Sequence, residues 1–254
     1  MTASTSIGNI PPPRQMLGMS IARKIRRTTP CYLPNFVANW TRSIQLAAHR
    51  RHPCRPSTYG HYELDKIHPY LNWINLMSYD LHGTWESTTN FHAHLHPADG
   101  DSSKLSVQEA VEGYLAAGVP ANKLVMGIPF YGIGWAGVPN QNNGLYQSAA
   151  GPAPSTGGPG SETYRLLKTL AYPSFRDPVT GGFWIYNGDV FWSYDDPQVI
   201  AAKVVWLKER GLAGAMVWSI DQDDVEGTLL NAVSEGLASG SIFLPVITKA
   251  ETGG

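Results

Sequence analysis

The sequence predicts an α/β fold in which parallel strands alternate with helices. First, 254 residues with 43% apolar content are enough for one large domain with a substantial core. Second, apolar runs with the period of a strand alternate along the chain with segments of helical period. Third, polar and aromatic residues follow the expected strands, at the carboxyl ends where the sites of parallel sheets form.

The first expected strand covers residues 72–79, where side chains alternate between two faces. One face carries Asn75, Met77 and Tyr79, and the other carries Ile74, Leu76 and Ser78. An apolar face opposite a mixed face is typical of a barrel strand, which packs under helices on one side and faces the lumen on the other. The strand ends at Asp80, and a glycine-containing loop follows as far as Trp85.

A helix and a second strand are expected next. Ser106 and Glu109 have the spacing of a capping box at the start of a helix over 106–117, and Gly118 ends it. Its expected buried stripe consists of Val107, Ala110, Val111, Tyr114 and Leu115. Residues 123–131 are nearly all apolar, which is typical of a buried parallel strand.

The segment after this strand has a different character. Residues 132–190 are rich in Gly, Asn and Pro with scattered aromatic residues, so we interpret them as an insertion of loops and short strands. One such strand is expected at Phe183–Tyr186.

Regular structure returns with a helix that Asp196 caps, that Pro197 opens and that Gly211 ends. A third strand over 213–219 and a last helix over 226–237 complete the alternating order. The residues expected to be buried in the helix after Asp196 are Ile200, Ala201, Val204, Val205 and Leu207.

Charge divides the chain unevenly. The net charge is -1 and 15% of residues are charged, which excludes a disordered chain and a polyanion-binding protein as a whole. Residues 1–60, however, hold nine basic residues and no acidic ones, where typical usage gives about seven acids. Two cysteines, Cys31 and Cys54, are too few for a disulfide framework or a four-cysteine zinc site. No apolar run approaches the length of a membrane-spanning helix.

Three explanations for the acid-free start stay open. It has the composition of a targeting sequence, it could be a basic arm for an anionic surface, or it is partly sequence from a frameshift, a retained intron or a wrong start. The abrupt change in composition near residue 60 favours the third explanation.

Three motifs carry a family resemblance. Leu76-Met77-Ser78-Tyr79-Asp80, with Trp85 five residues later, resembles the sixth-strand signature of family 18 glycoside hydrolases, the chitinases. Met126-Gly127-Ile128-Pro129-Phe130-Tyr131-Gly132 resembles the seventh strand, and Gly214-Ala215-Met216-Val217-Trp218-Ser219-Ile220-Asp221 resembles the eighth. The motifs follow the family order, and the resemblance covers about residues 57–238 and is greatest to secreted bacterial and fungal chitinases.

The resemblance implies a partial TIM (β/α)₈ barrel. Strands six to eight would be present, with a small α+β insertion between strands seven and eight and a remnant of the fifth strand before residue 57. We therefore expect three parts: a basic segment of doubtful structure over 1–56, a chitinase-like barrel fragment over 57–240, and a C-terminal tail over 241–254.

For function, the resemblance implies hydrolysis of β-1,4-linked N-acetylglucosamine in chitin, with retention. In this family the N-acetyl oxygen of the substrate itself attacks the anomeric carbon, so that no metal or organic cofactor is needed. The implied catalytic residues are Tyr79, which donates to the acetamido carbonyl group, and Asp80, which helps to hold the reacting sugar. The implied substrate-binding residues are Met77 in the lumen, Trp85 on the leaving-group side, Tyr131 along the cleft and Trp218 under the sugar.

The sequence departs from the family in one decisive place. The motif Asp-x-x-Asp-x-Asp-x-Glu, which supplies the general acid at the fourth strand, is absent. The sequence also has Ile133 where many members have an arginine. Because general-acid catalysis contributes about 10²–10⁴ in rate, we expect this chain alone to be inactive. The alternatives are a non-catalytic chitin-binding or oligosaccharide-binding protein, a fragment without function, and an unrelated α/β protein with a nucleic-acid arm.

Other residues are of types that bind ligands, but we expect them to have structural roles. His92, His94 and His96 alternate as metal ligands can, yet no cysteine or carboxylate pattern accompanies them, so we expect loop residues and no metal. Trp135, Tyr146, Trp184 and Trp192 could widen a sugar groove, but structural roles are favoured. We expect a monomer that binds chitin or chito-oligosaccharide, with no nucleic-acid partner and no membrane. The resemblance implies an extracellular protein, although no secretory signal is visible in this chain.

Overall fold

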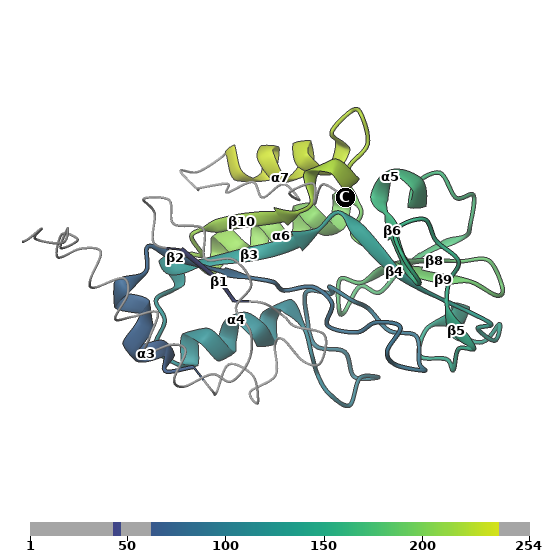
Figure 1. Ribbon diagram of the computed structural model, residues 1–254, viewed down its shortest axis with the longest axis horizontal. Coiled ribbons are helices and arrows are strands. Elements are labelled where there is room, and N and C mark those ends of the chain that lie inside the picture. Colours follow the sequence, from purple (N-terminus) through teal and green to yellow (C-terminus); the bar gives the residue numbers. More distant parts are fainter. Residues whose placement is uncertain (1–42, 47–61, 239–254) are drawn as a thin grey trace, which may run out of the picture.

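A computed structural model of the chain describes residues 43–46 and 62–238. Figure 1 shows two sheets side by side, with the long helices packed against the first one. The first sheet has the order β1-β2-β3-β10 and the second the order β5-β4-β9-β8-β7, with β6 also paired to β4. The strands of the first sheet are β1 (Ser43–Leu46), β2 (Trp73–Leu76), β3 (Leu124–Pro129) and β10 (Gly214–Trp218).

The first sheet is parallel throughout. β3 lies in the middle, where Leu124 is paired with Ile74 of β2 and Ile128 with Val217 of β10. The three predicted strands are thus neighbours in one parallel sheet, as an α/β fold requires. The strand predicted over 123–131 is nevertheless too long, because β3 ends at Pro129 and Tyr131 begins a strand of the second sheet.

The helices that connect strands of the parallel sheet begin at the predicted capping residues. The helices are α3 (Leu64–Ile67), α4 (Val107–Ala116), α5 (Tyr164–Leu167), α6 (Pro197–Glu209) and α7 (Thr228–Ala238). Ser106 Oγ accepts a hydrogen bond from the Glu109 amide at 3.1 Å, which is the first half of the predicted capping box. Asp196 Oδ1 caps α6 by accepting from the Val199 amide at 2.9 Å. The left-handed φ of Gly118, +86°, confirms its place after α4.

The two faces of the first sheet belong to different cores. Leu124, Met126 and Ile128 of β3 pack with α4, α6 and α7 in one apolar cluster. Val125 points the other way and packs in a second cluster with Met216 and with aromatic residues of the second sheet. This alternation is the period of two expected of a strand. On β2, Ile74 and Leu76 belong to the first cluster as predicted, and Met77 and Tyr79 pack with the second, although β2 ends at Leu76, three residues before the predicted end.

The second sheet is built from residues between β3 and α6. Its strands are β4 (Tyr131–Ala136), β5 (Gly151–Pro152), β6 (Ser161–Thr163), β7 (Ser174–Arg176), β8 (Phe183–Tyr186) and β9 (Phe191–Ser193). All of these strands pair in antiparallel fashion. β8 has the predicted bounds, and β9 extends the sheet three residues past position 190. That this sheet is an insertion within a larger barrel stays a prediction.

The ends of the chain are described only in part. β1 pairs in parallel with β2, with Ser43 opposite Trp73, so a strand precedes the three predicted ones. The rest of the basic segment over 1–56, with Cys31 and Cys54, and the predicted tail over 241–254 lie outside the described residues. None of the described helices has the length and apolar character needed to cross a membrane.

One helix differs from its predicted burial. Ala201 and Val205 of α6, predicted to be buried, are exposed, whereas Lys203 is fully buried. The reason is that the face of α6 toward the core runs through Ile200, Lys203 and Val204 at helical spacing. The ammonium group of Lys203 forms a buried ion pair with the Asp195 carboxylate. Burial lowers the pKa of Lys203 and raises the pKa of Asp195, while their mutual attraction opposes both shifts.

The buried ion pair gives a stability prediction. Lys203→Met leaves the Asp195 carboxylate buried without its partner, so we expect the free energy of unfolding in urea to fall by about 3–5 kcal/mol. Lys208→Met on the same helix is the control, because Lys208 is only half-buried and its Nζ donates to the Gly236 carbonyl oxygen at 3.0 Å. Adding Asp195→Asn to Lys203→Met should restore part of the loss. Equal effects of the two lysine variants would contradict a structural role for the pair.

Candidate functional site

The site begins where β2 ends. Ser78 Oγ donates to the carbonyl oxygen of Gly127 at 2.9 Å and accepts from the Gly127 amide at 3.0 Å, so one hydroxyl continues the pairing of β2 with β3. A side chain at position 127 would not fit, since a Cβ atom there would lie 2.4 Å from the Leu76 carbonyl oxygen and 2.8 Å from the Tyr79 ring. Glycine on β3 therefore sets the position of the residues that follow β2.

Tyr79, Asp80 and Tyr131 form the polar centre of the site. Tyr131 Oη donates to Asp80 Oδ1 at 2.7 Å. The rings of Tyr79 and Tyr131 meet edge to face, with centroids 6.1 Å apart. Asp80 has a φ of +55°, a left-handed conformation that costs about 1–3 kcal/mol for a residue other than glycine. The backbone thus turns sharply at Asp80, at the position where its carboxylate meets Tyr131.

Both tyrosines stay protonated over a wide pH range. Burial, together with the nearby Asp80 carboxylate, raises the pKa of Tyr79 and of Tyr131 well above the ordinary value. Each phenol is therefore a hydrogen-bond donor at neutral pH. Tyr131 uses its donor on Asp80, whereas the buried Tyr79 hydroxyl has no hydrogen-bond partner among the described residues. A buried donor without a partner is costly, so the Tyr79 hydroxyl is the group that a ligand would satisfy.

The structure brings five of the six predicted site residues together. Met77 and Trp218 are half-buried and pack against the same apolar cluster as Tyr79 and Tyr131, and Asp80 is bonded to Tyr131. Trp218 ends β10, and its carbonyl oxygen accepts from the Phe130 amide at 2.8 Å. The sixth residue, Trp85, lies apart from this cluster.

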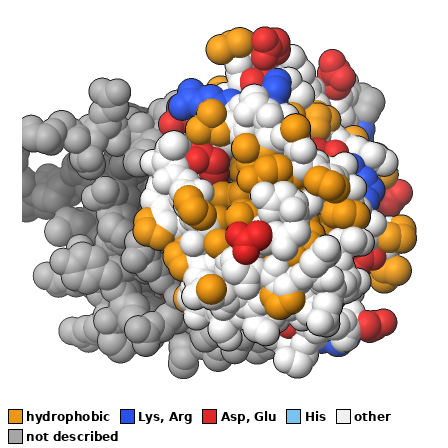
Figure 2. Space-filling view, turned by 90° about the vertical axis from the view of Figure 1, so that its right-hand side faces the viewer, with side chains coloured by type: hydrophobic (Ala, Val, Ile, Leu, Met, Phe, Trp, Pro, Cys, Tyr) orange, Lys and Arg blue, Asp and Glu red, His pale blue; other side chains and the backbone are white. Residues whose placement is uncertain are grey.

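Trp85 is in a turn of the loop that follows β2. The Glu86 amide donates to the Gly83 carbonyl oxygen at 2.9 Å, which closes a turn over residues 83–86, here called the Trp85 turn. The indole lies against Gly83, where a Cβ atom would come within 2.3 Å of the ring. Trp85 is 49% exposed. On the end of the molecule formed by the second sheet, apolar side chains are gathered between scattered charged ones (Figure 2).

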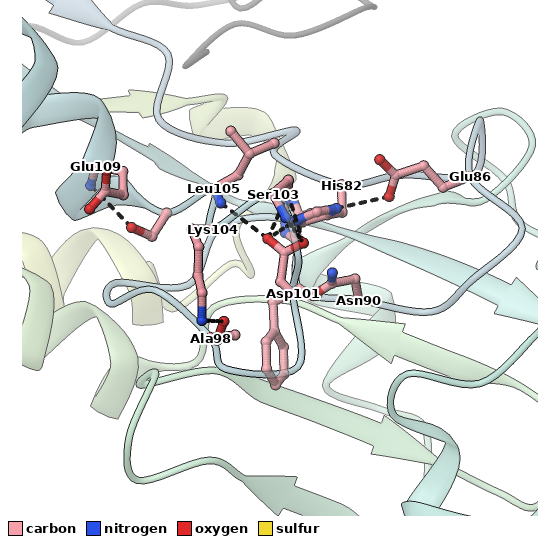
Figure 3. Close-up of polar contacts among 12 residues, drawn as sticks. His82, Glu86, Asn90, Ala98, Asp101, Ser103, Lys104, Leu105 and Glu109 are labelled. Carbon is pink, nitrogen blue, oxygen red and sulfur yellow. Dashed lines mark hydrogen bonds and ion pairs between the residues drawn. The ribbon is translucent and has the colours of Figure 1, made fainter. Parts of the chain in front are cut away.

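Sequence reasoning missed a buried polar group at the root of this turn. His82 Nδ1 lies 2.8 Å from Glu86 Oε2, and His82 Nε2 lies 3.1 Å from Asp101 Oδ2. Figure 3 shows the histidine between the two carboxylates, which we call the His82 cluster. The glutamate four residues after the histidine was a signal in the sequence, but Asp101 is distant in the chain and has no strand or helix to place it.

The three histidines that alternate in the sequence have separate environments. His92 and His94 are buried, and burial, with Lys203 near His92 and His82 near His94, lowers the pKa of each to about 3. His96 is half-buried, and its Nδ1 lies 2.8 Å from Gln108 Oε1. In residues 43–46 and 62–238, no group of three or more His, Cys, Asp or Glu side chains is arranged to hold a metal ion.

The remaining aromatic candidates are mostly core residues. Trp135, Trp184 and Trp192 are buried, and Tyr146 is half-buried. Trp135 Nε1 donates to the Glu86 carbonyl oxygen at 3.1 Å, and Trp184 Nε1 to the Asn143 carbonyl oxygen at 3.0 Å. These three tryptophans therefore pack in the two apolar clusters.

The arrangement has the groups needed to hold a polar ligand against an aromatic surface. Tyr79 offers a donor without a partner among the described residues, and Trp218 a half-buried indole in the same cluster. Asp80 adds a carboxylate that Tyr131 of that cluster orients. A flat indole and a polar handle beside it are suited to a sugar ring, which has apolar faces and polar edges.

Comparisons with known proteins point to one family. The family model of "Glycosyl hydrolases family 18" matches residues 35–223, so the match begins before the boundary expected at residue 57. Chitinase A1 of Niallia circulans is 36% identical over 203 residues, which are 74% of this chain and 29% of that protein. Chitinase 63 of Streptomyces plicatus is 36% identical over 171 residues, 66% of this chain and 27% of that protein.

A solved structure shares the fold. The catalytic domain of chitinase B from Arthrobacter TAD20 matches with a TM-score of 0.73 and 29% identity, over 93% of this chain and 51% of that chain. This chain thus spans less than a third of the two curated relatives and about half of that catalytic domain.

The glycine beneath Tyr79 gives a prediction with a matched control. Gly127→Ala sets a methyl group against the Leu76 carbonyl oxygen and the Tyr79 ring. We therefore expect the free energy of unfolding in urea to fall by about 1–3 kcal/mol relative to the unchanged chain. Gly151→Ala is the control, because no atom lies within 4 Å of a Cβ there. A Gly127→Ala chain as stable as the Gly151→Ala chain would mean that β3 does not set the position of Tyr79.

Proposed function

This chain belongs to glycosyl hydrolases family 18, and we propose that it takes part in hydrolysing β-1,4 linkages between N-acetylglucosamine units of chitin. The observation that carries the proposal is the buried Tyr79 hydroxyl, a donor without a partner among the described residues. It lies in one cluster with Trp218 and beside the Asp80–Tyr131 hydrogen bond.

In the proposed reaction the N-acetyl oxygen of the substrate attacks the anomeric carbon while the glycosidic bond breaks and the leaving oxygen takes a proton from a general acid. Water then opens the oxazolinium ion, so that the configuration is retained. Tyr79 donates its free hydrogen bond to the acetamido carbonyl group, which holds that oxygen in place for attack. Asp80, oriented by Tyr131, helps to hold the reacting sugar and its acetamido group. Trp218 forms the apolar floor beneath the ring, with Met77 packed beside it.

Trp85 and Tyr131 extend the proposed sugar site. The exposed indole of Trp85 would stack on a sugar on the leaving-group side, and the Tyr131 ring would line the cleft. The whole constellation needs no metal or organic cofactor, because the substrate supplies the nucleophile.

We propose that this chain alone does not cleave chitin. The residue that would protonate the leaving oxygen belongs to Asp-x-x-Asp-x-Asp-x-Glu, and this motif is absent from the 254 residues. Without the general acid, about 10²–10⁴ of the rate enhancement is missing. The second candidate is therefore a non-catalytic chitin or oligosaccharide binder, which the half-exposed Trp85 favours.

The setting of the proposed function follows from its substrate. Chitin is an extracellular polymer, so we propose that the protein acts outside the cell, on chitin or chito-oligosaccharide, as a monomer. The partial barrel of strands six to eight, with the second sheet as its insertion, belongs to the same proposal.

The binding role of the aromatic residues can be measured with the full chain and N-acetylchitohexaose. We expect Trp85→Ala to raise Kd about two- to tenfold, the range of one aromatic stacking contact. Tyr79→Phe should raise Kd by a similar factor, because it removes one hydrogen bond to the acetamido group. Isothermal titration calorimetry measures Kd, and chromatography of the sugar measures cleavage.

Tyr70→Ala is the matched control for Trp85→Ala, since Tyr70 is 46% exposed and belongs to the short helix after α3. Its Kd should equal that of the unchanged chain. Hexasaccharide binding that none of these variants weakens would overturn the proposed site. Cleavage of the hexasaccharide by the unchanged chain would overturn the proposal that the chain alone is inactive.

A further inference from the structure

The Trp85 turn is held from below by the His82 cluster. His82 comes just before the turn and Glu86 closes it, so the contact of 2.8 Å between their side chains spans the turn from one end to the other. The second ring nitrogen of His82 reaches Asp101, on the segment before α4. The turn is thereby tied to a part of the chain nineteen residues away.

Two carboxylates on one imidazole require a particular protonation state. A neutral imidazole has one donor and one acceptor nitrogen, whereas the protonated ring donates from both. His82 faces a carboxylate oxygen with each nitrogen, so only the protonated ring makes both hydrogen bonds. Asp101 is held in its charged form by donors from Ser103 and from the Leu105 amide.

Among residues 43–46 and 62–238, Glu86 and Asp101 are the only ion-pair partners of His82. The histidine is 2% exposed. Glu86 of the loop after β2 and Asp101 of the segment before α4 face His82. The ring of His94 also lies near it, with the two ring centroids 6.2 Å apart. Because burial lowers the pKa of His94 to about 3, that ring is neutral and does not compete for the carboxylates.

Independent contacts fix the rest of the turn. The Glu86 carbonyl oxygen accepts from Trp135 Nε1 of β4 at 3.1 Å. The Thr84 methyl group lies against Gly160, where a Cβ atom would come within 2.4 Å of it. The turn therefore rests on the second sheet through a backbone hydrogen bond and a methyl contact, and His82 links it to Asp101.

We propose that protonated His82 is a positioning residue, which fixes the Trp85 turn by bridging Glu86 and Asp101 and so presents the indole to the sugar. The sugar part of this inference rests on the proposed function, in which Trp85 stacks on substrate. His82 itself is buried beneath the turn and acts through Trp85 rather than on the sugar.

The bridge depends on pH in a defined window. Burial by itself lowers the pKa of His82, but the hydrogen bonds to Asp101 and Glu86 outweigh it and raise the pKa to about 9. A histidine whose pKa is raised on folding contributes stability that is complete below its unfolded pKa, about 6.5, and that is lost as pH rises through the folded value. The turn should therefore be held at neutral pH and loosen near pH 9.

Hydrogen exchange without any sugar tests the positioning role. In the unchanged chain, mass spectrometry of peptides over residues 83–89 should show amide protection that falls through pH 8–10, after correction for intrinsic exchange rates. His82→Gln should raise exchange there about tenfold or more at pH 7 and abolish the pH step, since it removes a charged hydrogen-bond donor. Glu86→Gln, which keeps the shape of the side chain, should move the step to lower pH.

His96→Gln is the matched control, because this nearby histidine contacts a neutral glutamine and no carboxylate. It should leave the pH step unchanged. Thermal unfolding of each variant shows whether it folds, and the pH step of the unchanged chain tests the bridge without any variant. A flat pH profile in the unchanged chain, or normal protection in a folded His82→Gln chain, would overturn the proposal.

A double-mutant cycle with N-acetylchitohexaose tests the path through Trp85. His82→Gln should raise Kd about two- to tenfold in the unchanged chain, but less than about 1.5-fold in a Trp85→Ala background, where no indole is left to position. Additive effects would overturn the link to Trp85. If neither the unchanged chain nor any variant binds the hexasaccharide, the proposed function fails. The exchange experiment still decides the role of His82.

Discussion

The candidate site depends on the pairing of one serine hydroxyl with one glycine. β2 ends at Leu76, yet Tyr79 and Asp80 must still lie beside β3 to meet Tyr131. Ser78 Oγ makes both a donor and an acceptor bond to the Gly127 backbone, so the two segments stay paired past the end of the strand. Gly127 allows this approach because it has no side chain. The costly left-handed turn at Asp80 is maintained because the residues before it are held from two sides.

Two buried cations stabilise segments that apolar packing alone does not hold. Lys203 is fully buried on α6 against Asp195, and His82 is buried between Glu86 and Asp101. In each case at least one carboxylate comes from a segment outside the helices and strands, so the pairing ties a loop to the fold. A buried charge is tolerated only with such partners. The apolar cores position the sheets, and these ion pairs position the connections that carry or flank the site.

The sequence predicted what depends on periodicity and on local signals. The parallel strands, the cap at Ser106, the cap at Asp196 and the short strand β8 all follow from patterns within a few residues. The meeting of Met77, Tyr79, Tyr131 and Trp218 followed from a family resemblance rather than from spacing. The burial of Lys203 could not be predicted, because a lysine is expected to face solvent. The His82 cluster could not be predicted, because Asp101 lies in no helix or strand that would fix its position. Their partners become visible only once distant loops are brought together.

The charges around the site are arranged so that Asp80 is bound by a neutral donor. Tyr131 lies between Asp80 and His92, with the His92 ring 5.3 Å from its own. Burial keeps that imidazole neutral at physiological pH, so it adds no positive charge beside the phenol. Ten residues earlier in the chain, His82 has two carboxylate neighbours and the opposite charge preference. Both are buried histidines of the loop after β2, so the neighbouring carboxylates decide which one becomes a fixed cation. The buried positive charge of His82 thus lies beneath the Trp85 turn, paired with Glu86 and Asp101.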